Sequence, residues 1–286
     1  MFAALSLAGM VLCTRFLGNK GFSSKQILIF ILGLNALSFL ALLIPSFDTF
    51  INSANLSIFL IIIAIAGVLS CIGNLTDFTA VIKAPNPGFA DAIKSSNILL
   101  TLFLSMLLFH SQFSFGKLLG AVFIIIGIAL LVVDKKSAQK NEKLSSNWKV
   151  LAIIGAVCFS IVTLFMKKLT QLNFGALEIG LFTSGIAFVF ILISGRKEIK
   201  NCFSNKEKIK IFLPVVVLAS AFSLVAGIFN IKGIALSPNP GYHDAIRNSR
   251  ILFATLLSVP LLGATINKQS FLGVIAILIG MAILVI

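Results

Sequence analysis

Long apolar stretches separated by short polar ones run along the whole chain. Runs such as Leu56–Gly73, Leu118–Val133 and Phe271–Ile286 contain almost no charged residue. Each belongs to a segment close to the roughly 20 residues that a helix needs to cross a bilayer. The stretches are apolar all round and do not alternate between apolar and polar residues, which indicates helices and argues against a membrane β-barrel.

The apolar runs predict ten membrane-spanning helices, five in each half of the chain. The first five are expected at Phe2–Leu17, Ile27–Ile44, Leu56–Lys83, Gly88–Phe109 and Lys117–Val133. The last five are expected at Val150–Met166, Gly175–Ser194, Ile211–Leu236, Gly241–Leu262 and Ser270–Ile286. Residues 1–133 and 150–286 would then be two five-helix repeats joined by a lysine-rich linker at 134–149. The predicted fold class is an all-α polytopic membrane protein.

One short phrase occurs twice and divides the chain in two. Residues 85–94 read PNPGFADAIK, and residues 238–247, 153 positions later, read PNPGYHDAIR. The correspondence continues without a gap to the last residue, and it places Ser96 on Ser249 and Gly120 on Gly273. Such a register indicates an internal repeat. With five spans per repeat the two copies cross the membrane in opposite directions, which is the inverted-repeat design of many secondary transporters.

Composition supports a protein embedded in the lipid bilayer. The 286 residues are 58% hydrophobic and 11% charged, whereas soluble domains average about 45–50% apolar and about 25% charged residues. The net charge of +14 does not indicate a nucleic-acid partner, because most cations lie in short loops between spans. The four cysteines show no metal-binding spacing, and neither a metal nor a cofactor is expected.

Loop charges bear on the orientation of the chain. Most loop lysines and arginines follow predicted spans 1, 5, 7 and 9. Cytoplasmic loops are enriched in these residues, so the distribution favours both termini outside the cytoplasm. One missed or extra span would reverse this orientation.

The repeated phrase predicts a sharp turn that restarts a helix. A proline lacks an N–H group and disfavours helical geometry in the residue before it, while asparagine caps helices well and proline fits the first helical position. Spans 3 and 4, and spans 8 and 9, should therefore form tight hairpins. The simplest interpretation is that these residues only shape the turn: Pro85, Asn86, Pro87, Gly88, Pro238, Asn239, Pro240 and Gly241.

Charged residues follow each turn inside a predicted span. Asp91 and Lys94 are three residues apart, as are Asp244 and Arg247, and such neighbours on a helix can pair. A charge at the centre of a membrane helix costs about 2.5–3.5 kcal/mol on insertion scales, and such groups usually face a substrate or ion path. Internal ion pairs that orient the helix are the alternative. One helical turn after these pairs, Asn97 and Arg250 occupy equivalent positions of the two repeats.

Spans 3 and 8 add a second polar set. Asn74 and Asp77 share one face of span 3, and Asn230 occupies the repeat position of Asp77. Lys232 lies shortly before the second turn and is a candidate counter-ion for Asp77. Either charge could instead extend to a nearby interface.

Glycines recur on the fifth span of each repeat. Small residues on one stripe allow membrane helices to pack closely without a hydrophobic driving force. We therefore interpret the following residues as helix-packing positions: Gly116, Gly120, Gly127, Gly273 and Gly280.

The repeated hairpins, each followed by a helix with two glycines seven residues apart, resemble the drug/metabolite transporter superfamily, in particular its EamA-like branch. The resemblance implies that spans 3, 4, 8 and 9 line a central cavity and that both termini are cytoplasmic, against the loop charges. Related four-span exporters carry a proton on a glutamate in their first helix. Span 1 here has no acidic residue and has Arg15 near its end, so that mechanism does not transfer.

The sequence thus predicts a secondary transporter, a permease or exporter in the cytoplasmic membrane that works by alternating access. The excess of cations after the turns favours small polar metabolites such as amino acids or related zwitterionic or anionic compounds. A coupling proton could use Asp77, Asp91 or Asp244, and the protein could be a monomer or a homodimer. The alternative is a non-transporting scaffold or partner subunit. An enzyme is disfavoured, because no acid, base and nucleophile come together in the sequence.

Overall fold

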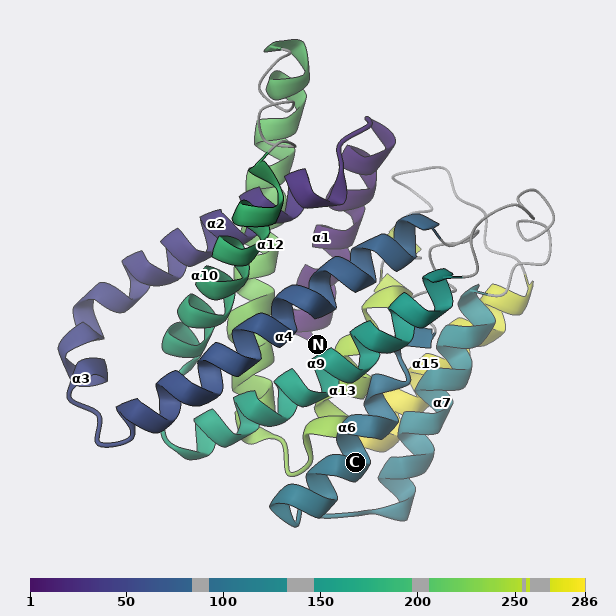
Figure 1. The fold of residues 1–286 in the computed structure, drawn as a ribbon. Helices are drawn as coiled ribbons and strands as arrows, with labels where there is room; N and C mark the ends of the chain where they lie inside the picture. The colour runs from purple at the N-terminus through teal and green to yellow at the C-terminus, as the bar shows by residue number, and fades with distance from the viewer. Residues whose placement is uncertain (84–92, 133–146, 197–205, 254–255, 258–267, 286) are drawn as a thin grey trace. The chain divides into compact units, whose positions relative to one another are not determined.

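The computed structural model describes residues 1–83, 93–132, 147–196, 206–253, 256–257 and 268–285, and these ranges contain helices and no β-strand (Figure 1). The first repeated turn, Pro85–Gly88, and Asp91 lie outside the described residues. The helices are α1 (Phe2–Asn19), α2 (Ser24–Leu43), η1 (Ile44–Ser46), α3 (Phe47–Ile51), α4 (Leu56–Lys83), α6 (Asn97–Phe109), α7 (Phe115–Val132), α9 (Asn147–Gln171), α10 (Ala176–Ser194), α12 (Lys206–Leu236), α13 (Pro240–Asn248) and α15 (Lys268–Val285).

The helices are those of a multi-pass membrane protein. Six segments of the described residues are long and apolar enough to cross a bilayer: Phe2–Asn19, Ser24–Ile51, Leu56–Ala80, Asn147–Gln171, Ala176–Ser194 and Ile209–Leu236. Three shorter apolar helices are Asn97–Phe109, Phe115–Leu130 and Phe271–Leu284. The all-α membrane class is therefore confirmed, while the count of ten crossings and the inversion of the repeats stay predictions.

Two predicted spans are interrupted, which the apolar pattern did not reveal. The helical turn that contains Lys94 ends at Ser95 and Ser96 before α6 begins, and α13 ends in a turn at Ser249. The Ser249 hydroxyl donates to the carbonyl oxygen of Ile246 at 2.5 Å. Serine hydroxyls compete in this way with the helical hydrogen bonds of the backbone. Since Ser96 and Ser249 are equivalent in the repeat, both copies break at the same position.

The chain forms two compact units, and neither unit is one half of the sequence. The first unit consists of Met1, Ile72–Leu164 and Ser237–Ile286, and the second of Phe2–Cys71 and Phe165–Leu236. Helices α4 and α9 each contribute to both units. The repeat boundaries predicted at 133 and 150 fall inside the first unit, so the compact units and the sequence repeats are different divisions of the chain.

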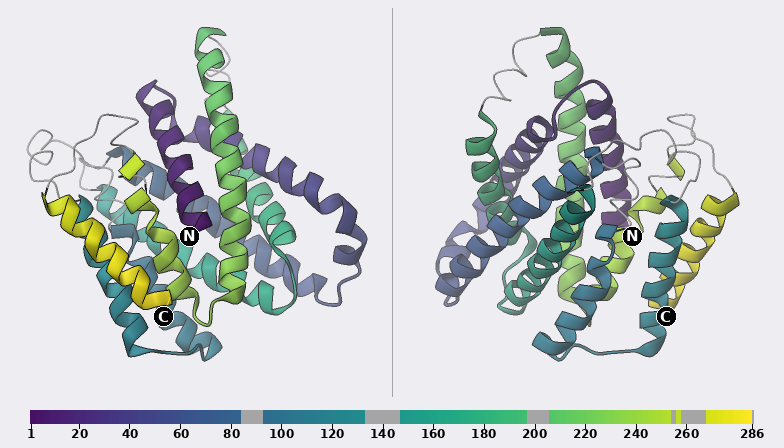
Figure 2. Two further views of the ribbon diagram at one scale, coloured as in Figure 1. Left: turned by 180° about the vertical axis from the view of Figure 1, so that it is seen from behind. Right: turned by 45° about the vertical axis from the view of Figure 1, so that its right-hand side comes forward.

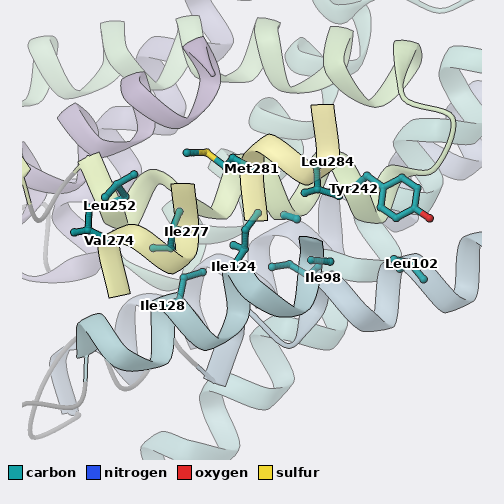
Figure 3. Packing of buried hydrophobic residues seen from close by; sticks show 12 residues of the cluster. Ile98, Leu102, Ile124, Ile128, Tyr242, Leu252, Val274, Ile277, Met281 and Leu284 are labelled. Atoms are coloured by element: carbon teal, nitrogen blue, oxygen red, sulfur yellow. The ribbon is translucent and has the colours of Figure 1, made fainter. Parts of the chain in front are cut away.

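Helices α7 and α15 pack closely in the first unit (Figure 3). A Cβ atom on Gly120 would lie 2.9 Å from the carbonyl oxygen of Gly280, and one on Gly127 would lie 2.7 Å from that of Gly273. Four of the five predicted packing glycines therefore meet in pairs. Gly116 does not meet another glycine in this way. It is exposed, and a Cβ atom on it would meet only the Ser114 Oγ, at 3.8 Å. In the first turn of α7, Gly116 therefore makes no close approach of this kind to a described residue.

A core of aliphatic side chains surrounds this glycine contact. It includes Ile124 and Ile128 on α7, Ile277 and Met281 on α15, and Ile98 on α6 (Figure 3). Tyr242 on α13 closes one end of the core, and its hydroxyl accepts a hydrogen bond from the Ser114 backbone N–H at 3.1 Å. The core therefore fixes α6 and α13, the helices that carry the site described below.

The second unit is built from longer helices. Helix α1 packs along α12 (Figure 2), and α2 packs against α10 and α12. Phe22, Phe30 and Phe212 form one aromatic contact between α2, the loop before it and α12. Phe59 and Phe174 pack against each other in a second cluster, with tilted rings whose centroids are 4.4 Å apart.

Candidate functional site

The second repeated turn ends α12 and starts α13 as the sequence predicts. Asn239 is the N-cap of α13: its side-chain oxygen accepts from the Gly241 N–H at 2.8 Å and from the Ser105 hydroxyl at 2.7 Å. Pro240 occupies the first helical position. A Cβ atom on Gly241 would lie 2.5 Å from the Cα atom of Leu102. This turn therefore also docks the start of α13 directly onto α6.

Asp244 lies one turn into α13 and is fully buried. Its Oδ2 atom accepts hydrogen bonds from the Thr101 hydroxyl at 3.0 Å and from the Asn97 amide at 3.4 Å, both on α6. Its Oδ1 atom lies 3.1 Å from the Arg247 Nη2 in an ion pair along α13, but like the Asp77 Oδ1 it has no hydrogen-bond partner among the described residues. The Thr163 hydroxyl of α9 also interacts with this carboxylate. The carboxylate thus connects three helices of the first unit.

Asn97 extends this network at the two interrupted helices. It is the first residue of α6, and its side-chain oxygen accepts from the amide of Asn248, the last residue of α13, at 2.8 Å. Its backbone carbonyl accepts from the Ser160 hydroxyl of α9 at 3.3 Å. The interruption that follows α13 and the one that precedes α6 therefore meet at a buried pair of asparagines. We refer to Asp244, Asn97, Thr101, Arg247 and Asn248 as the asparagine–aspartate cluster.

A second ion pair lies outside this cluster. The Lys94 ammonium group pairs with the Asp77 Oδ2 atom on α4, and both residues are buried, with 5% and 8% of their surface exposed. The ring of Phe159 on α9 lies against the ammonium group, with 4.8 Å between the nitrogen and the ring centroid. The Oδ1 atom of Asp77 is buried without a hydrogen-bond partner. One carboxylate oxygen of this pair is therefore still open to a donor.

Comparison with known proteins identifies the second half of the chain. Residues 146–286 match the EamA-like transporter family. The second half of the chain therefore belongs to the EamA-like transporter family. No curated protein matches the sequence. One solved crystal structure is similar to this protein, with a TM-score of 0.77 and 14% sequence identity. The alignment covers 99% of the present chain and 93% of the chain in that structure. At this identity it shows a shared fold alone.

The EamA-like match includes α13 but not the Lys94–Asp77 pair. Asp244 and Arg247 lie inside the matched residues, and Asp77, Lys94 and Asn97 come from the earlier half. The first unit nevertheless brings residues of both halves together, because Asn97 contacts Asp244 and Asn248. Residues far apart in this EamA-like sequence thus share one site.

The other residues singled out in the sequence are more dispersed. Asn74 and Arg250 are half-buried in the first unit, and Asn230 is half-buried on α12 of the second unit. Lys232, a candidate counter-ion for Asp77, is exposed on α12, and the ion-pair partner of Asp77 is Lys94. Across the described ranges, no group of three or more histidine, cysteine, aspartate or glutamate side chains could hold a metal ion.

Four residues of this region were missed in the sequence. Thr101 follows Asn97 by one helical turn, so the shared helix face was a usable signal. Ser160, Thr163 and Asn248 gave none, because single uncharged polar residues are common in membrane helices and their partners lie far away in the sequence.

Proposed function

We propose that this EamA-like protein is a secondary transporter of small polar metabolites, such as amino acids and related zwitterionic or anionic compounds. It works by alternating access across the cytoplasmic membrane. The observation that carries the proposal is the buried Lys94–Asp77 pair, in which one carboxylate oxygen has no hydrogen-bond partner. Charged groups in apolar spans usually mark a substrate or ion path.

Stability alone gives little reason to keep this pair. Replacing a buried ion pair with well-packed apolar residues is often neutral or stabilising, by about 1–4 kcal/mol. The ion pair has a function if its members can exchange partners during transport. Lys94 can leave Asp77 and bind the carboxylate of a substrate, while Asp77 binds the amino group of the substrate or a coupling proton. The cation–π contact with Phe159 then holds the ammonium group during the exchange.

The asparagine–aspartate cluster has a different role in this proposal. Its carboxylate already accepts from Thr101 and Asn97 and faces Arg247, so it holds α6 and α13 in place and shapes the path. The remaining path residues are proposed from their charge or polarity and their repeat positions: Asn74, Asp91, Asn230, Lys232 and Arg250.

The glycine contacts support an inverted arrangement of the repeats. Gly120 corresponds to Gly273 in the repeat, and Gly127 corresponds to Gly280. The contacts join Gly120 to Gly280 and Gly127 to Gly273, so α7 and α15 are antiparallel and the repeat operation exchanges the two contacts. A two-fold axis that relates antiparallel helices is perpendicular to them, and in a membrane such an axis lies in the plane of the bilayer.

A charge-swap experiment tests the function. Purified protein is reconstituted into liposomes and assayed for uptake of a panel of radiolabelled amino acids and other small metabolites. Lys94→Ala and Asp77→Asn should each abolish uptake of the transported compound, because each removes one group of the exchange. Lys149→Ala, which changes an exposed lysine on α9, should leave uptake unchanged.

The variant that combines Asp77→Lys with Lys94→Asp separates transport from structure. It should fold like the wild-type protein, measured as the monodisperse fraction on size-exclusion chromatography, but it should not take up the compound, because the two charges have changed places. Full uptake by the swapped variant would show that the pair is only structural. If the wild-type protein takes up none of the compounds, a scaffold or partner subunit is the better account.

A further inference from the structure

Lys167 is a buried lysine that the proposed transport path does not use. It lies near the end of α9, and only 9% of its surface is exposed. Its ammonium group donates hydrogen bonds to the backbone carbonyls of Ile234 at 3.1 Å and Ala235 at 3.0 Å. Both carbonyls belong to the last turn of α12, which ends at Leu236. All three residues are in the second unit.

The sequence after α12 explains why these carbonyls need an outside donor. In an α-helix the carbonyl of Ile234 would accept from the N–H four residues later. That residue is Pro238, which has no N–H. The carbonyl of Ala235 would accept from Asn239, but Asn239 has extended backbone angles, φ −137° and ψ 120°, and begins the next helix. The repeated turn thus leaves two carbonyls free, and Lys167 supplies the donors.

The charge of Lys167 also suits this place. The carbonyl end of a helix carries a partial negative charge, and a cation there is stabilising. Lysine provides three donors on one nitrogen, so a single side chain can serve both carbonyls. The neighbouring Lys168 is exposed and takes no part.

We propose that Lys167 is a positioning residue that fixes the end of α12 and thereby the turn at 237–239. Asn239 in this turn caps α13, whose next turn carries Asp244. Lys167 therefore acts through the backbone of α12 on the turn that leads into α13. Its importance for transport rests on the proposed function, whereas its effect on the turn does not.

A cysteine at Ser237 reports the state of the turn directly. Ser237 is half-buried between α12 and α13, and its reaction with a water-soluble maleimide is measured in purified protein whose native cysteines have been replaced. Lys167→Met should speed labelling several-fold, since the carbonyls lose their donors and the end of the helix opens. Lys167→Arg should restore slow labelling, because a guanidinium group can also donate to two carbonyls. Lys168→Met is the matched control and should have no effect.

A second reporter separates local opening from general loss of structure. Ser220, buried in the middle of α12, is replaced by cysteine in parallel, and its labelling should stay slow in every variant. If Lys167→Met does not fold, Lys167→Gln, which keeps an amide donor, should give an intermediate rate at position 237. Unchanged labelling at position 237, or an equal increase at position 220, would overturn the proposal. Failure of liposome uptake by the wild-type protein would contradict the proposed function and leave this labelling result intact.

Discussion

Replacing Asp244 with alanine is expected to lower the yield of folded protein severely. The change leaves the Arg247 guanidinium without its carboxylate and removes the acceptor of the Thr101 and Asn97 donors. Removing one partner of a buried ion pair costs about 3–5 kcal/mol, which is a large share of the roughly 5–15 kcal/mol by which proteins are stable. The measurement is the monodisperse fraction on size-exclusion chromatography in detergent after a series of heating steps.

The controls for Asp244 separate charge from position. Asp48→Ala removes an exposed carboxylate on α3 and should leave the melting temperature unchanged. Asp244→Asn combined with Arg247→Met should recover part of the stability lost in Asp244→Asn, because the cation that faced the carboxylate is removed as well. The account would be contradicted if Asp244→Ala melted at the same temperature as Asp48→Ala.

Replacing Gly127 with leucine should separate α7 from α15. Even a Cβ atom at this position would lie 2.7 Å from the carbonyl oxygen of Gly273 and 2.8 Å from the backbone nitrogen of Ile277. Backbone atoms cannot rotate away as a flexible side chain can, so the helices must move apart. Overpacking typically costs about 1–3 kcal/mol and sometimes more, and the separated helices would also expose the aliphatic core around Ile124 and Ile277. The expected result is a large fall in melting temperature in detergent.

Alanine at two glycines of α7 provides the matched comparison. Gly127→Ala should lower the melting temperature, because the added Cβ atom meets backbone. Gly116→Ala adds the same atom where only the Ser114 Oγ lies nearby, at 3.8 Å. It should leave stability unchanged or raise it slightly, by roughly 0.5–1 kcal/mol, because alanine favours the helix more than glycine. Equal effects of the two variants would refute the packing described for α7 and α15.

The sequence was sufficient where the signal is local. Span 3 was predicted at Leu56–Lys83, and α4 has those ends. The turn at Asn239 and Pro240 was predicted from capping chemistry, which depends on a few neighbouring residues. Both features follow from apolar length and from the missing N–H of proline, so no knowledge of the tertiary structure was needed.

The sequence was insufficient where two helices must meet. Asp77 is 17 residues from Lys94. The helix pattern alone indicated Asp91 as a neighbour of Lys94 and Lys232 as a candidate counter-ion for Asp77. The interruptions at Ser95, Ser96 and Ser249 were invisible, because serine is tolerated within membrane helices and the apolar run continues on both sides. Gly116 shares a spacing with Gly120, but spacing alone does not show which positions of a helix approach a neighbouring helix.

The arrangement of the units was also beyond the sequence. The repeat predicts two consecutive halves, whereas each compact unit takes helices from both. Contacts between the halves, such as that between Asn97 and Asn248, which are 151 residues apart, hold these helices together in one unit. Hydrophobic periodicity determines which residues are apolar, but it does not determine which apolar faces pair.

Water access at two positions of the first unit tests the central claim most directly. In protein whose native cysteines have been replaced, Lys94→Cys and Thr101→Cys are labelled with a charged, water-soluble thiol reagent in membrane vesicles. If Lys94 lies on a solute path and Thr101 is buried within the asparagine–aspartate cluster, position 94 will react and position 101 will not. Protection of both positions, or equal reaction at both, would contradict the account.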